Sequence, residues 1–209
     1  MTEVEICNQA LLKLGQSPIM SMEDNSVLAR KCKQEFGAAL GVVLRAYQWP
    51  FAIKRVSLPL SSELPEFGYA KYYVLPRDIA RIQDIDTAGY KYQIEGQNIA
   101  TDAPYANIRY VTKDVAITAL DDQTVEVVAL QLAYRLSIVI TENMQLKDML
   151  LQEYDMALTH ARNIWSVEDY PQESPEGTWI TSRGGTVGIQ DTYNPWGADG
   201  TGVTSWPQK

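Results

Sequence analysis

The sequence has few of the residues on which many enzymes and metalloproteins depend. Its 209 residues include one histidine, His160, and two cysteines. One histidine cannot supply the two-histidine motifs of zinc sites, and it is the only candidate base for a Ser-His-Asp triad. No G-x-S-x-G segment provides a nucleophile for such a triad. We therefore expect no enzymatic activity, no catalytic or metal-binding residues and no cofactor, and we interpret His160 as an ordinary helix residue.

Disulfides and membrane spans are not indicated either. Cys7 and Cys32 fall on apolar faces of predicted helices, so we interpret them as reduced core residues. The first ten residues contain neither the basic nor the apolar region of a signal peptide. The most apolar run, 125–140, includes Glu126 and Arg135 and is shorter than a bilayer span requires. We expect the protein to be made and used in a cytosol-like environment, or in a particle assembled there, without membrane contact.

Positive charge is scarcer than negative charge, with 18 basic against 26 acidic residues and a formal net charge of −8. Binding to nucleic-acid phosphates requires a basic surface, which this balance does not favour. Carboxylate pairs such as Asp84 with Asp86 could in principle form a glycosidase-like site. We interpret them instead as residues of turns and helix N-termini.

Hydrophobic residues that recur every three or four positions predict four helices, over residues 2–15, 25–48, 122–140 and 143–167. Thr2 and Glu5 form a capping box, and Gly15 suits the position after the last turn of the first helix. The third helix is apolar on two faces, as expected for a helix enclosed by other elements. A short break joins it to the fourth, which predicts an antiparallel hairpin.

Between the second and third helices, over about 67–114, apolar and polar residues alternate as they do in strands. Tyr90, Tyr92 and Ile94 alternate with polar residues and predict a half-buried strand. Three isoleucines between 79 and 85 are three positions apart, and this spacing does not decide between helix and strand. We expect one small antiparallel sheet of three to five strands.

The composition changes at Pro171. Residues 171–209 contain 7 of the 13 glycines, 4 of the 10 prolines and three of the five tryptophans. The glycine-rich run 183–188 lacks the lysine of a phosphate-binding loop. We expect an extended arm that becomes ordered on a partner, although a flexible tail has the same glycine and proline content. The expected partner-docking residues are Trp179, Ile180, Arg183, Tyr193, Trp196 and Trp206.

Short segments spread over about residues 5–166 carry a resemblance to a known family. They are I-C-N-Q-A-L-L-K-L-G-Q-S-P-I at 6–19, S-M-E-D-N-S at 21–26, A-R-K-C at 29–32, W-P-F-A at 49–52, K-Y-Y-V-L-P-R-D at 71–78, Y-Q-I-E-G-Q-N-I at 92–99, I-R-Y-V at 108–111, A-L-Q-L-A-Y-R-L at 129–136 and L-Q-E-Y-D-M-A-L-T-H-A-R at 151–162. In order and spacing these segments resemble the bacteriophage head-to-tail adaptor (connector) family, which includes the tail tubular protein A of short-tailed phages.

The resemblance implies a virion protein at the portal-tail junction, synthesised and assembled in the cytoplasm of the bacterial host. Such subunits form a ring, expected to be dodecameric, beneath the portal protein. The genomic DNA passes through the lumen without sequence-specific binding, and the nozzle or other downstream tail proteins dock below. The expected fold class is α+β, mainly α. Residues 1–170 would form a bundle of about four helices with an inserted small antiparallel sheet, and 171–209 would form an arm that holds the portal or a neighbouring subunit.

Other functions are compatible with the same residues. The chain could be a head-completion or tail-terminator protein with another symmetry, or a bacterial scaffold unrelated to phages. A virion-associated peptidoglycan hydrolase is the enzymatic alternative, which the shortage of catalytic residues disfavours.

Overall fold

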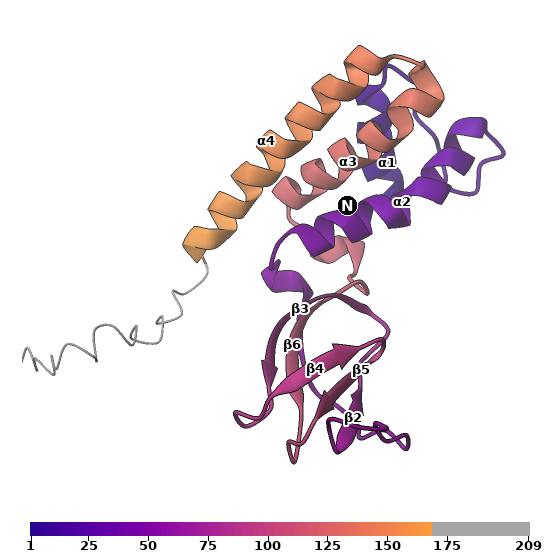
Figure 1. The fold of residues 1–209 in the computed structure, drawn as a ribbon. Coiled ribbons are helices and arrows are strands. Elements are labelled where there is room, and N and C mark those ends of the chain that lie inside the picture. Colours follow the sequence, from indigo (N-terminus) through magenta and orange to yellow (C-terminus); the bar gives the residue numbers. More distant parts are fainter. Residues whose placement is uncertain (169–209) are drawn as a thin grey trace, which may run out of the picture. The chain divides into compact units, whose positions relative to one another are not determined.

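The computed structural model describes residues 1–168. The four expected helices are present as α1 (Glu3–Lys13), α2 (Val27–Ala46), α3 (Asp122–Thr141) and α4 (Met144–Glu168). Strands lie between α2 and α3, so the fold is α+β and about half helical (Figure 1). The predicted helix ends are within two residues of the observed ones. The expected arm over 171–209 lies outside the described residues.

Helix α1 has the ends that its sequence predicts. The amide of Glu5 donates to the Thr2 hydroxyl and the amide of Thr2 donates to the Glu5 carboxylate, which completes the capping box. After the last turn, Gly15 adopts a φ of +67°. Its amide donates to the carbonyl of Leu12 and the next amide, of Gln16, donates to that of Leu11. This is a Schellman ending, which favours glycine at the left-handed position.

Helix α3 is the centre of the helical body and contacts α1, α2 and α4. Gln123 near its start lies beside His160 near the end of α4, so the two helices form the expected antiparallel hairpin (Figure 1). By length and composition α3 is the one described helix that could cross a membrane, which corrects the expectation that this run is too short and too polar. Eleven of its residues are buried in the body, as in the core helix of a globular protein.

An aromatic cluster lies where the helical body meets the strands. The chain leaves α2 at Ala46 and turns through a short 3-10 helix, Pro50–Ala52. Trp49 in this turn is fully buried and packs between Tyr47 and Phe51, with ring centroids 5.3 and 5.9 Å away. Phe51 in turn contacts Trp165 of α4. The corner therefore joins the C-terminal end of α2 to the C-terminal end of α4 through large aromatic side chains.

The strands form two three-stranded antiparallel sheets rather than the single expected sheet. Sheet A has the order β1-β6-β3 and sheet B the order β2-β5-β4. The strands are β1 (Ile53–Ser57), β2 (Lys71–Val74), β3 (Ile79–Asp86), β4 (Tyr92–Glu95), β5 (Asn98–Thr101) and β6 (Asn107–Thr112). The β region therefore begins at 53 and not at about 67. The sequence of β1 does not reveal it, because two charged residues separate its apolar ones and no alternation results.

The three isoleucines of β3 show why their spacing was ambiguous. Ile79, Ile82 and Ile85 pair with residues 112, 110 and 108 of β6, which are alternate positions on one face. The register shifts twice, so seven residues of β3 lie opposite five of β6. Each bulge adds one residue to the strand, and two bulges convert a period of two into a period of three. All three isoleucines consequently face the same side of sheet A.

A second apolar cluster fills the space between the two sheets. Tyr73 and Ile99 contribute from sheet B, and Ile108 and Tyr110 from sheet A. Strand β4 differs from its expectation, because all four of its residues are exposed. It is an edge strand with one neighbour, so the alternation of Tyr92 and Ile94 does not correspond to half-burial.

Asp78 joins the start of β3 to the other strands of sheet A. Its Oδ2 accepts from the Thr112 hydroxyl at 2.7 Å and lies 3.2 Å from Lys54 Nζ, and its Oδ1 accepts from the Tyr110 hydroxyl at 3.2 Å. The hydrogen bond from Thr112 and the interaction with Lys54 lower the pKa of Asp78 below the ordinary value of 3.8.

Replacing Asp78 by asparagine is expected to lower the free energy of unfolding by about 1–2 kcal/mol at neutral pH. A carboxylate with a lowered folded pKa stabilises the fold above its unfolded pKa, and loses this effect as the pH falls through the folded value. The difference from wild type should therefore shrink in acid. Urea unfolding at neutral and acidic pH measures it. Asp114→Asn is the control, because the Asp114 carboxylate is exposed and its one ion pair among residues 1–168 is with Lys54, at 3.8 Å. An equal loss there would contradict the assignment.

Candidate functional site

The residues expected to dock a partner, Trp179, Ile180, Arg183, Tyr193, Trp196 and Trp206, all lie outside the described residues. Within residues 1–168, no three histidine, cysteine or acidic side chains are grouped as a metal site would require. His160 is exposed, and its Nδ1 lies 3.3 Å from the amide oxygen of Gln123.

Both cysteines lie in the core of the helical body, as expected. Cys7 and Cys32 are free and fully buried. A hydrogen bond with Cys32 and burial raise the pKa of Cys7, which keeps it a thiol. A buried thiol of this kind is a packing residue and not a nucleophile.

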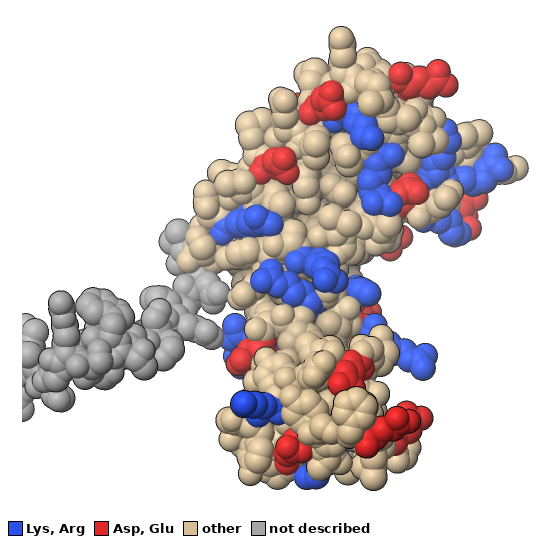
Figure 2. Space-filling model, in the orientation of Figure 1, with Lys and Arg blue, Asp and Glu red and all other residues tan. Residues whose placement is uncertain are grey.

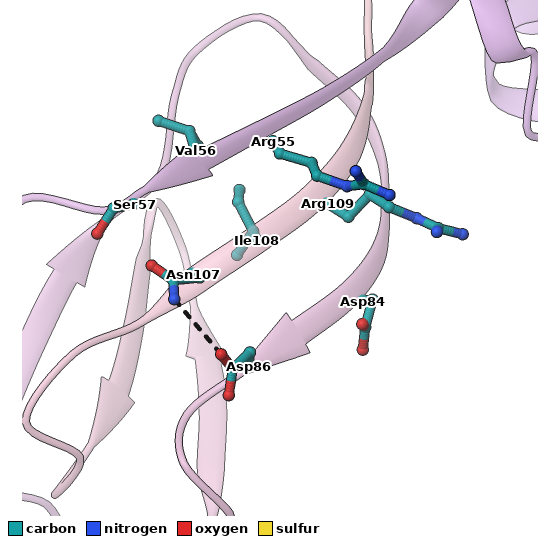
Figure 3. A pocket seen from close by; sticks show the side chains of 8 residues that line it. All are labelled: Arg55, Val56, Ser57, Asp84, Asp86, Asn107, Ile108 and Arg109. Atoms are coloured by element: carbon teal, nitrogen blue, oxygen red, sulfur yellow. Dashed lines mark hydrogen bonds between the residues drawn. The ribbon is translucent and has the colours of Figure 1, made fainter. Parts of the chain in front are cut away.

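The candidate site is the polar face of sheet A, a set of six polar side chains on one surface of that sheet. They are Arg55 and Ser57 of β1, Asn107 and Arg109 of β6, and Asp84 and Asp86 of β3. Together they surround an open hollow of about 440 Å³ (Figure 3). Directly opposite residues of neighbouring strands point to the same side of a sheet, which is why three strands bring these side chains together.

The register arranges the six side chains in two rows across the sheet. In the first row Arg109 is paired with Arg55 on one side and Asp84 on the other. In the second row Asn107 lies between Ser57 and Asp86, and its amide donates to the Asp86 carboxylate at 3.4 Å (Figure 3).

The charged side chains of the first row, Arg55, Arg109 and Asp84, form no ion pair within residues 1–168. Arg55 and Arg109 are directly opposite each other, an arrangement that is unfavourable for like charges. Arg109 Nε donates to the Gln83 side-chain oxygen at 2.7 Å, and no carboxylate of the described residues lies within 4 Å of either guanidinium. The side-chain amide nitrogen of Gln83 is buried and has no hydrogen-bond partner among the described residues. The two guanidinium groups can therefore bind carboxylates of another molecule.

The charges of this face suit the binding of a charged group. Among residues 1–168, neither a histidine nor a carboxylate is hydrogen-bonded to the Ser57 hydroxyl. The expectation that Asp84 and Asp86 belong to a turn is wrong, because both lie in β3. The two bulges concealed the alternation that would have assigned them to a strand face. The regular alternation of residues in β6 could have assigned Arg109 and Asn107 to one face of a strand.

No family model matches this chain, and no curated protein is significantly similar to it in sequence.

Proposed function

We propose that this protein is a structural head-to-tail adaptor of a tailed bacteriophage, forming a ring beneath the portal. The ring, of twelve copies in this proposal, surrounds the channel through which DNA passes and provides the surface on which tail proteins dock. Its subunits join by heterologous contacts that close through rotation. The protein acts by assembly and not by catalysis.

The observation that carries the proposal is the resemblance over about residues 5–166, in which nine segments occur in the family's order and spacing. The fold is compatible with it, because a helical body with an inserted β region is the architecture that the resemblance implies. The segment at 6–19 covers most of α1 and its ending, and the one at 92–99 covers β4, the turn after it and the start of β5.

Exposed side chains of the described residues provide surfaces for such contacts. The polar face of sheet A has two unpaired arginines beside two carboxylates, which favours a charged protein surface as its partner. Large apolar side chains are exposed on the loops of the β region, among them Leu64 and Phe67 at 68% and 87% exposure. Exposed apolar groups of this size are typical of docking surfaces in assemblies.

Native mass spectrometry of the protein alone and mixed with the portal protein of the same phage tests the proposal. We expect a complex in which the portal ring gains about twelve copies of a 23.5-kDa subunit, since a closed ring matches the portal's symmetry. A gain of six copies would indicate a tail-terminator or other head-completion protein, and no complex at all would contradict the adaptor. Clearing of purified peptidoglycan by the protein would instead indicate a hydrolase.

A further inference from the structure

A local concentration of positive charge lies at the junction between α2 and the strands. Figure 2 shows basic side chains gathered where the helical body meets the β region. The hollow there, of about 530 Å³, is called the junction groove, and its four basic residues are Arg45, Arg77, Arg81 and Lys113. No acidic residue lines it, and within residues 1–168 none of the four forms an ion pair. A chain with a net charge of −8 thus has an unneutralised cationic groove.

The floor of the junction groove is apolar. Ile79 and Ile82 line it from β3, Leu75 lines it from the connection after β2, and Ile94 lines it from β4. Ile94 is 47% exposed, although its cross-strand neighbour Ile99 is fully buried. The apolar inner face of sheet B therefore continues to its edge strand and is left uncovered there. A ligand that fits this groove must provide both apolar and negatively charged groups.

The groove also borders an open strand edge. Strands β3 and β4 each have one neighbour in their sheets, and both line the groove. The two bulges make β3 a poor template for a further strand, whereas β4 pairs with β5 in unbroken register. The opposite edge of sheet B is occupied, because Val74 donates to Pro59 and Ser61 to Tyr72 of β2. Among the edges of sheet B, the one at β4 is available to another chain.

We propose that the junction groove binds an extended segment of a partner protein in which acidic and apolar residues alternate, and that the segment pairs with the free edge of β4. Its apolar side chains would extend the inner face beyond Ile94 and cover Ile82. Its carboxylates would meet Arg77, Arg81 and the other two basic residues at the rim. Strand addition of this kind obtains affinity from backbone hydrogen bonds and specificity from alternate side chains. A nucleic acid would satisfy the cations but leave the apolar floor uncovered.

Peptide binding is measured on the full-length chain without a portal, so its outcome does not depend on the adaptor function. The probe is a fluorescein-labelled nine-residue peptide of alternating glutamate and valine, with binding followed by fluorescence anisotropy. We expect saturable binding to the wild-type protein and a loss of about tenfold or more in affinity for Arg77→Glu/Arg81→Glu. The matched control is Arg30→Glu/Lys33→Glu, which reverses two exposed basic residues of α2 that do not line the groove and should bind as wild type does. Circular dichroism establishes that both variants are folded.

Three further probes separate pairing from charge attraction. A peptide with N-methylated amides at alternate positions retains its carboxylates but cannot form strand hydrogen bonds, and it should bind at least about tenfold more weakly. A peptide with lysine in place of glutamate should not bind. No binding of the glutamate peptide, equal losses in the two double variants, or equal binding of the N-methylated peptide would overturn the proposal. Displacement of the peptide by a short DNA duplex that binds more tightly would also overturn it and assign the groove to nucleic acid.

Discussion

Replacing Trp49 by alanine is expected to lower the free energy of unfolding by about 3–5 kcal/mol, the largest stability change we predict for a single residue. The side chain is fully buried between Tyr47 and Phe51, so its removal leaves a cavity at the junction of α2 and the β region. Chemical denaturation followed by circular dichroism measures the loss. A change below about 1 kcal/mol would show that the corner is not part of the cooperative core.

The indole of Trp49 has a second role, at the end of α2. Its Nε1 donates to the carbonyl of Val43 at 2.8 Å, and Arg162 of α4 donates to that of Ala46 at 2.9 Å. These carbonyls belong to the last turn of the helix, where no intrahelical amide satisfies them. Trp49→Phe retains most of the packing and loses the hydrogen bond, so it should cost about 1–2 kcal/mol and separates the two contributions.

Ending the chain after Asp169 is expected to abolish stable binding to the portal protein while leaving the described fold intact. The two apolar clusters of the described unit are built from residues up to Trp165, so the truncation removes none of them. It removes Trp179, Trp196 and Trp206, the expected anchors of the arm. Buried tryptophans at interfaces commonly contribute about 2 kcal/mol or more each. Native mass spectrometry of the truncated chain mixed with the portal measures the outcome.

A full-length chain with those three tryptophans replaced by alanine is the companion variant. It retains the length and charge of the arm, and it should lose portal binding to nearly the same extent as the truncation. Unchanged portal binding and infectivity of either variant would remove the arm from the assembly mechanism. A truncated chain that no longer unfolds cooperatively would instead show that residues beyond 169 contribute to the fold.

Local sequence rules predicted the helices of this protein well. Capping at Thr2, the glycine at position 15 and the two-sided apolar pattern of α3 are short-range features, and each corresponds to the observed structure. The β region was predicted less well. Strands β1 and β3 are both defined by their pairing with β6. The bulges of β3 and the charged residues of β1 interrupt the alternation that would have predicted these strands from the sequence.

The scarcity of catalytic and metal-binding residue types is determined by composition alone. One histidine, two cysteines and an excess of acidic residues describe the chain whatever its fold. Only the tertiary structure placed Arg55 opposite Arg109 and assembled four cations into the junction groove. Residues distant in sequence become neighbours through strand register and through the packing of α2 on β3. A net charge of −8 therefore says nothing about where positive charge gathers on the surface.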